Sequence, residues 1–197
     1  GEIKGCRPEH LVAVIEKLEE IGVRIERRGD DTLFVRGDGE FRPTDIETAP
    51  YPGFPTDMQA QLTALLCLAE GESRVRDNIF HQRFLHCLEL QRLGADLMVI
   101  GNTAHIRGGR KVFGAPVMAS DLRASAALVV AGLAAKGETE VLRVYHIDRG
   151  YERIEEKLAS LGAEIRRINP RRNPLAITVN GDTPDYPPTL PEDFIPE

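Results

Sequence analysis

Residues 119–138, "ASDLRASAALVVAGLAAKGE", are the stretch on which the fold depends. Apolar side chains surround nearly the whole circumference of a helix drawn through it, which is typical of a helix buried on every side. Gly137 predicts the end of that helix. A short polar cluster, Ser120, Asp121 and Arg123, lies at its beginning. A buried helix with a charged start indicates either a capped end or a functional site.

The same form occurs earlier, in residues 55–72, "PTDMQAQLTALLCLAEGE". Asp57 and Asp121 occupy equivalent places, each in the first turn of a predicted helix. Asp is a preferred N-cap and complements the helix dipole, so capping is one interpretation of both residues. Arg123 fits that interpretation poorly, because a cation in the first turn opposes the dipole. Arg123 therefore indicates an anion close to this helix start.

The chain contains an internal repeat that is marked by three glycines. Each predicted helix ends at a glycine and is followed by apolar alternation, in "LEEIGVRIE" from Leu18, "LQRLGADLMV" from Leu90 and "LASLGAEIRR" from Leu158. Glycine is the expected residue after a helix because it enters the left-handed conformation without steric cost. The three glycines lie roughly 70 residues apart, a spacing typical of a large supersecondary unit.

Short strands surround these helices in a regular order. Strands that end in glycine turns are predicted for residues 32–37, 104–109 and 176–181. Strands that lead into the first helix of each repeat are predicted for residues 2–6, 73–80 and 139–147. The repeating unit is thus strand, helix, strand, strand or extended segment, and a second helix. Two units are complete, and the third lacks its second helix. Residues 169–197 hold one extra strand and a tail rich in Pro and acids, for which we expect no regular structure.

Composition limits the classes of function. The 197 residues carry a net charge of −6, which argues against a general nucleic-acid or anionic-membrane binder. No apolar run reaches about 18 residues, and no signal peptide opens the chain. The three cysteines lack a CxxC pair and predict neither a disulfide framework nor a zinc site. We therefore expect a cytoplasmic α/β protein without a metal or other cofactor.

Three arginines occupy the junctions between strands and helices: Arg83, Arg123 and Arg149. Guanidinium groups at helix starts bind carboxylate or phosphate bidentately, so the three side chains are candidates to converge on one small anionic ligand. The alternative is that each pairs with a nearby acid: Asp121, Asp148 or Glu152. We expect the histidines of these junctions to be structural and hydrogen-bonded: His81, His86 and His146.

Three motifs resemble one known family over most of the chain. "PTDMQAQ", the stretch from residue 119 and "HIDRGYERIEEKLASLGAEI" from His146 are similar to bacterial UDP-N-acetylglucosamine 1-carboxyvinyltransferases, the enolpyruvyl transferases of peptidoglycan synthesis, which serves cell shape and division. The resemblance implies two domains, each an inside-out α/β barrel of pseudo-threefold strand–helix repeats around buried helices, with the active site between them. Residues 1–168 match only the second, C-terminal domain, and its third repeat is incomplete.

The resemblance also implies a reaction and a set of site residues. The 3-hydroxyl of the amino sugar attacks C2 of phosphoenolpyruvate, C3 is protonated, and phosphate leaves. Asp57 matches the proposed base for the hydroxyl, and Asp121 a carboxylate of the proton-transfer and elimination steps. The remaining matched positions bind substrate: Ile79 and Phe80 line the UDP-sugar site, and Arg83, Arg123 and Arg149 bind phosphoenolpyruvate or its phosphate.

The family's other domain supplies a lysine, an arginine and a reactive loop cysteine, none of which has a counterpart here. The resemblance thus predicts that the isolated chain is inactive and that its partner is the missing N-terminal domain, in cis or in trans. It predicts neither nucleic acid nor membrane as a partner. Two alternatives remain: a standalone, non-catalytic domain that binds a ligand or a protein, and an enolpyruvyl transferase acting on 3-phosphoshikimate.

Overall fold

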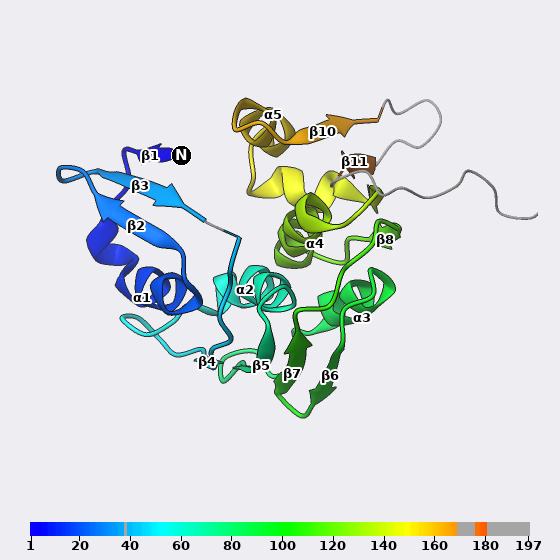
Figure 1. Cartoon of the computed structure of the whole chain (residues 1–197), viewed down its shortest axis with the longest axis horizontal. Coiled ribbons are helices and arrows are strands. Elements are labelled where there is room, and N and C mark those ends of the chain that lie inside the picture. Colours follow the sequence, from blue (N-terminus) through cyan, green and yellow to red (C-terminus); the bar gives the residue numbers. More distant parts are fainter. Residues whose placement is uncertain (38, 169–175, 181–197) are drawn as a thin grey trace, which may run out of the picture.

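The computed structural model describes residues 1–37, 39–168 and 176–180, and it shows a mixed α/β arrangement (Figure 1). The strands form three sheets. The first sheet has the order β1-β3-β2, the second β4-β5-β7-β6 and the third β8-β9-β11-β10. The strands are β1 (Glu2–Lys4), β2 (Arg24–Arg27), β3 (Thr32–Arg36), β4 (Ile46–Glu47), β5 (Gly71–Arg76), β6 (Leu97–Ile100), β7 (Thr103–Gly108), β8 (Pro116–Met118), β9 (Glu138–Leu142), β10 (Glu164–Arg167) and β11 (Ala176–Asn180).

Helices lie between and beside these sheets. The α-helices are α1 (Val12–Ile21), α2 (Gln59–Leu66), α3 (Leu85–Arg92), α4 (Leu122–Ala134) and α5 (Ile154–Ser160). Short 3₁₀ helices precede α1, α2 and α5: η1 (Pro8–His10), η2 (Thr56–Met58) and η3 (Val144–Arg149).

Each sheet contains the same three-stranded arrangement. The hairpins β2–β3, β6–β7 and β10–β11 are antiparallel, and β1, β5 and β9 run antiparallel beside the second strand of each hairpin. The second and third sheets gain one parallel strand each, because β4 pairs with β5 and β8 pairs with β9. Within the described residues β1 has no such parallel neighbour.

The three predicted glycine helix ends are confirmed. Gly22, Gly94 and Gly162 have φ angles of 110°, 91° and 98°. These angles lie in the left-handed region that a side chain disfavours. The Gly22 N–H donates to the carbonyl groups of Leu18 and Glu19, which closes the end of α1. The chain then reverses into the first strand of each hairpin.

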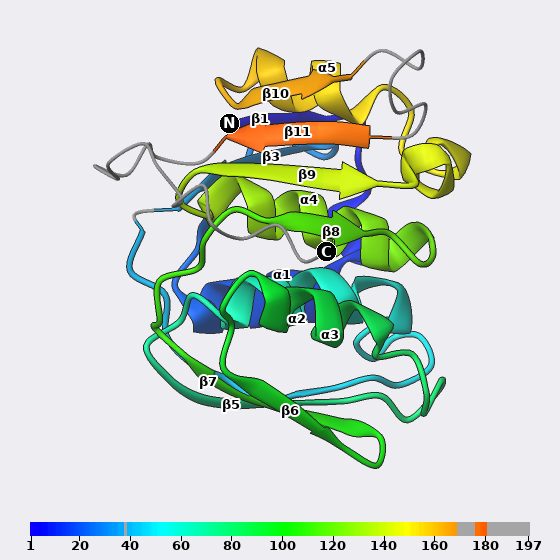
Figure 2. The same cartoon turned by 90° about the vertical axis from the view of Figure 1, so that its right-hand side faces the viewer.

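Helices α2 and α4 pack against each other between the sheets, as both views show (Figures 1 and 2). Leu62 and Leu66 of α2 and Leu128 of α4 are buried. Helix α4 also lies close to the third sheet, since a side-chain carbon at Gly132 would come within 3.2 Å of Val179 Cβ. The prediction that these two helices are buried on every side is confirmed.

Several element ends differ from the predicted ones. Helix α4 ends at Ala134 rather than at Gly137, because Ala135 is already extended, with φ −72° and ψ 143°. The strand predicted for residues 73–80 ends at Arg76, where the side chain of Asp77 turns the backbone. The strand predicted for residues 139–147 ends at Leu142, because Arg143 adopts a φ of 62° and starts η3. The predicted extended tail lies outside the described residues, whereas β11 is an inner strand of the third sheet.

Candidate functional site

The beginnings of α2 and α4 lie side by side and bring two carboxylates together. Asp57 lies in η2, directly before α2, and Asp121 directly precedes α4. Arg123 joins them: its Nε lies 2.8 Å and its Nη2 2.5 Å from Asp57 Oδ1. The prediction that both helices present their acids at one common end is therefore confirmed.

Asp57 and Asp121 have different local roles although their positions in the repeat are equivalent. Asp121 Oδ1 accepts hydrogen bonds from the N–H groups of Arg123 and Ala124 at 2.8 and 3.0 Å. Asp121 is therefore an N-cap. Its second oxygen, Oδ2, accepts a longer bond of 3.3 Å from the Ser120 hydroxyl. Asp57 caps neither η2 nor α2, and its side chain is 60% exposed.

Arg83 reaches the same carboxylate from the loop before α3. Its Nη1 lies 3.6 Å from Asp57 Oδ1 and donates a 3.4 Å hydrogen bond to Thr56 Oγ1. The guanidinium also stacks over the Phe80 ring, 3.8 Å from the centroid. This cation–π contact holds it flat against an apolar surface. Arg83 and Arg123 thus converge on one oxygen. Arg123 pairs with Asp57 of the preceding repeat. The alternative prediction, that it pairs with the nearby Asp121, is wrong for this side chain.

A hollow of about 540 Å³ opens beside this cluster. Its walls combine exposed apolar side chains, one guanidinium and one carboxylate, and the lining residues are Ile79, Phe80, His81, Gln82, Arg83, Leu85 and Asp121. Such a surface offers an apolar face for a ring and a guanidinium for an anionic group. The hollow suits a ligand that carries both.

Arg149 is not joined to this cluster by a direct contact. It ends η3 and is exposed, and its side chain makes no hydrogen bond or ion pair with another residue in the part of the chain that the structure describes. The adjacent backbone nevertheless lies against the first turn of α4, since a side-chain carbon at Gly150 would come within 2.9 Å of Leu122 Cδ2. Arg149 therefore stands beside the beginning of α4, and no described residue pairs with its guanidinium.

The buried carboxylate of Asp77 belongs to the same region and was not predicted from the sequence. Asp77 is fully buried and accepts hydrogen bonds from the backbone N–H groups of Ile79 and Phe80, at 2.9 Å each. Burial raises its pKa, but the bonds from Phe80, Thr56, Thr48 and Ile79 outweigh that effect and hold the pKa below its usual value. The sequence signal that could have indicated this residue is the pair Asp77-Asn78 directly after the strand, since Asp and Asn favour turns.

His86 and the nearby cysteines lie in the core. Burial lowers the pKa of His86 to about 4, although the charge of Asp121 opposes that shift, so the imidazole is neutral at pH 7. Its Nε2 lies 3.6 Å from Cys87 Sγ. Burial raises the thiol pKa values of Cys67 and Cys87 to about 12, which keeps both thiols protonated and unreactive. His86 is structural, as predicted, whereas His81 lies on the rim of the hollow.

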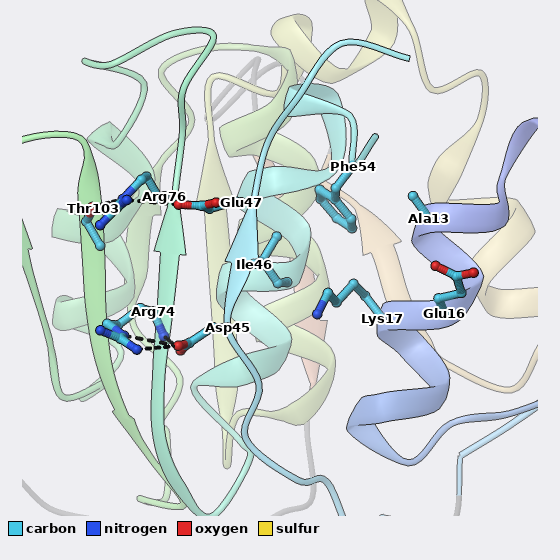
Figure 3. A pocket seen from close by; sticks show the side chains of 10 residues that line it. All are labelled: Ala13, Glu16, Lys17, Asp45, Ile46, Glu47, Phe54, Arg74, Arg76 and Thr103. Carbon is cyan, nitrogen blue, oxygen red and sulfur yellow. Dashed lines mark hydrogen bonds and ion pairs between the residues drawn. The ribbon is translucent and has the colours of Figure 1, made fainter. Parts of the chain in front are cut away.

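A second hollow, of about 590 Å³, lies between α1 and the β4–β5 edge of the second sheet (Figure 3). Each of its cations has an acidic partner: Arg74 Nη2 lies 2.6 Å from Asp45, Arg76 Nη1 2.9 Å from Glu47 and Lys17 Nζ 2.7 Å from Glu20. Figure 3 shows the two arginine pairs, each bridging β5 and the neighbouring segment that contains β4. No cation of this hollow is left over for an anionic ligand, so the helix starts are the better candidate site.

Among the described residues no helix is both long enough and apolar enough to cross a membrane. Comparison with known proteins identifies the family of the chain. Residues 2–158 match the family model described as EPSP synthase (3-phosphoshikimate 1-carboxyvinyltransferase). The chain belongs to this family of 1-carboxyvinyl, or enolpyruvyl, transferases.

Within that family the curated relatives point to one member. The UDP-N-acetylglucosamine 1-carboxyvinyltransferase of Anaeromyxobacter sp. (strain Fw109-5) is 62% identical over 165 residues, and that of Oleidesulfovibrio alaskensis is 58% identical over 166 residues. Each alignment covers 84% of this chain but only 39% and 40% of the relative. The chain therefore spans about two fifths of the length of these relatives.

Solved structures give the same picture of the fold. The enolpyruvyl transferase NikO from Streptomyces tendae superposes with a TM-score of 0.75 at 30% identity, over 84% of this chain and 39% of NikO. EPSP synthase from Acinetobacter baumannii superposes with a TM-score of 0.67 at 17% identity, over 86% of this chain and 39% of its own. The second likeness shows the fold alone.

Proposed function

We propose that this chain carries one half of the active site of an enolpyruvyl transferase that moves the enolpyruvyl group of phosphoenolpyruvate to the 3-hydroxyl of UDP-N-acetylglucosamine. The observation that carries the proposal is the convergence of Arg83 and Arg123 on Asp57, with Asp121 at the adjacent helix start. Curated relatives of 56–62% identity, all named for the amino-sugar reaction, favour that substrate over 3-phosphoshikimate.

The geometry suits the two proton transfers of an addition–elimination. Asp57 is an exposed carboxylate whose position is fixed by Arg123, so it is accessible to a sugar hydroxyl, and a base must lie within hydrogen-bond reach of the proton that it removes. Asp121 lines the hollow, with Oδ1 used for capping and Oδ2 bonded only by the longer contact from Ser120, and we assign it to proton transfer at C3 and the loss of phosphate. The guanidinium groups of Arg83, Arg123 and Arg149 stabilise the carboxylate and phosphate of phosphoenolpyruvate.

The apolar loop beside this cluster is assigned to the UDP-sugar. Ile79 is 39% and Phe80 47% exposed. Both are large apolar side chains of the kind that a folded domain normally covers. Their backbone is held firmly by Asp77. A rigid apolar surface next to two cations fits a planar or ring-bearing anion.

The rest of the active site and of the domain lies outside this chain. The strand β1 lacks the parallel neighbour that β5 and β9 possess among the described residues, which supports a further strand–helix segment that completes a pseudo-threefold, inside-out α/β barrel. The family's other domain, in cis or in trans, is the proposed partner and closes the site against water. The three unpaired thiols fit a cytoplasmic location, and no nucleic acid or membrane is needed as a partner.

The test is phosphate release from phosphoenolpyruvate in the presence of UDP-N-acetylglucosamine. The chain alone should show none, whereas the chain mixed with the separately produced remainder of a relative should show turnover. 3-Phosphoshikimate serves as the control acceptor and should remain unused. Turnover by the isolated chain would contradict the split site, and an assembled protein that binds both substrates without turnover would favour a non-catalytic binding domain.

A further inference from the structure

Four hydrogen bonds converge on one buried carboxylate at the carboxyl end of β5. Asp77 Oδ1 accepts from the Thr48 hydroxyl at 2.8 Å and from the N–H groups of Ile79 and Phe80 at 2.9 Å each. Asp77 Oδ2 accepts from the Thr56 hydroxyl at 2.7 Å. No lysine or arginine within the described ranges pairs with this carboxylate, so its charge is balanced by these four donors alone.

The donors come from three separate pieces of chain, and two of them carry proposed site residues. Ile79 and Phe80 form the apolar loop that lines the hollow. Thr56 immediately precedes Asp57, and its hydroxyl also accepts from Arg83 at 3.4 Å. Thr48 anchors the arrangement to the backbone after β4, where it also accepts from Asn78 N–H at 2.9 Å.

The two oxygens of Asp77 therefore serve different parts of the site. Oδ1 holds the loop that contacts the sugar, and Oδ2 holds the residue that precedes the proposed base. Hydrogen bonds to an ionised acceptor are about twice as strong as neutral ones, and burial excludes competing water. A single group can thus keep both pieces in register.

We propose that Asp77 is a positioning residue that couples the UDP-sugar loop at Ile79 and Phe80 to the base Asp57 through Thr56. The assignment rests on the function proposed above, but the structural coupling is measurable without it. Asp77 touches neither substrate in this assignment. It acts only through the groups that it holds.

The first experiment uses the full chain and measures hydrogen exchange of the Ile79 and Phe80 amides by NMR. Asp77→Ala should accelerate exchange of both amides at least about tenfold, because it removes their acceptor. The matched control is Asp45→Asn, since Asp45 also accepts a backbone N–H, from Arg74 at 2.8 Å, but at the other end of the same strand pair. Unchanged exchange at Ile79 and Phe80 would overturn the proposal.

Asp77→Asn and Thr56→Val keep the test decisive if Asp77→Ala does not fold. Asn retains an oxygen for the two amides but is uncharged, so exchange should rise by a few fold. Thr56→Val removes the Oδ2 contact and the longer Arg83 contact but neither amide bond, and it should leave the Ile79 and Phe80 amides protected. The opposite pattern would overturn the assignment of the two oxygens. In that pattern Thr56→Val accelerates exchange of the Ile79 and Phe80 amides and Asp77→Asn leaves it unchanged.

The second experiment uses the chain assembled with the remainder of a relative. Thr56→Val should lower kcat about tenfold with little change in KM for the sugar, because a displaced base slows the chemical step. Thr56→Ser keeps the hydroxyl and should restore kcat. Equal kcat values for the Thr56→Val and Thr56→Ser variants would overturn the coupling to Asp57. If the unmodified assembly does not turn over, the proposed function fails, while the exchange measurements still decide the role of Asp77.

Discussion

Arg123 of α4 donates two hydrogen bonds to a single oxygen of Asp57, which lies 66 residues earlier in the chain, at 2.8 and 2.5 Å. The pair joins the starts of the two buried helices. It also explains why a cation is tolerated in the first turn of α4, where the helix dipole opposes it. The carboxylate that it faces belongs to the other helix.

The first prediction concerns Asp121 and separates capping from chemistry. Asp121→Asn should leave the free energy of unfolding nearly unchanged, since Asn caps as well as Asp, whereas Asp121→Ala should cost about 1 kcal/mol. In the assembled enzyme Asp121→Asn should lower turnover by a factor on the order of 10² or more, because the proton-transfer group is lost. Urea unfolding and phosphate release measure the two effects. A large stability loss with normal turnover would show that Asp121 is only a cap.

The second prediction concerns Arg123, whose partner Asp57 has a side chain that is 60% exposed. Arg123→Ala should change the free energy of unfolding by less than about 1 kcal/mol, because exposed ion pairs contribute little. Loss of the cation should weaken phosphoenolpyruvate binding in the assembled enzyme. Arg110→Ala is the matched control, since Arg110 forms an exposed ion pair with Asp96 at 3.0 Å, away from the site. Equal substrate affinity in both variants would remove Arg123 from the binding site.

The third prediction concerns the pH dependence of stability. The folded-state pKa of His86, about 4, lies below the ordinary value of 6.5, so the unfolded chain binds the proton first. The His86 contribution to stability is therefore complete above pH 6.5 and is lost as the pH falls toward 4, by up to about 1.4 kcal/mol per pH unit. Urea unfolding of the native protein and of His86→Gln at pH 7 and pH 5 should show a smaller loss in the variant. Parallel losses would place the imidazole in contact with solvent.

The fourth prediction concerns the junction that presents Arg149. Arg167 of β10 donates to Asp148 Oδ1 and Oδ2 at 2.7 and 3.0 Å and to Glu155 Oε1 at 2.8 Å, so it ties the end of η3 to α5. Arg167→Met should lower the free energy of unfolding by about 1 kcal/mol, the upper range for partly exposed pairs.

The same change should weaken phosphate binding in the assembled enzyme, since Arg149 loses its support. The neighbouring Arg166 is 73% exposed and lies 4.0 Å from Glu138, so Arg166→Met is the control and should be neutral in both assays. Melting temperature and inhibition by inorganic phosphate are the measurements. If Arg167→Met changes neither the melting temperature nor the inhibition by phosphate, the end of η3 does not depend on the contacts of Arg167 with Asp148 and Glu155.

Local physical rules were sufficient for much of the fold. Gly22, Gly94 and Gly162 end their helices because no other residue enters the left-handed region as cheaply, and this depends on the backbone alone. The all-round apolar character of residues 122–134 likewise predicts a buried helix before any partner is known. The helix starts and junctions of the repeat indicated the two acids and three arginines of the candidate site, and the family resemblance added Ile79, Phe80 and the individual roles. Of these, Asp57, Asp121, Arg83 and Arg123 gather at one end of α2 and α4.

Only the tertiary structure distinguished the roles of Asp57 and Asp121 and revealed the hydrogen-bond donors of Asp77. Asp57 and Asp121 look alike in the sequence, yet only Asp121 caps a helix, because η2 turns Asp57 outward to Arg123. The strand from residue 73 stops at Arg76 because Asp77 accepts the next amides, and its other donors lie 21 and 29 residues away. Contacts between distant segments depend on how helices and sheets pack, and a local sequence pattern carries no information about which donors that packing brings to a buried carboxylate.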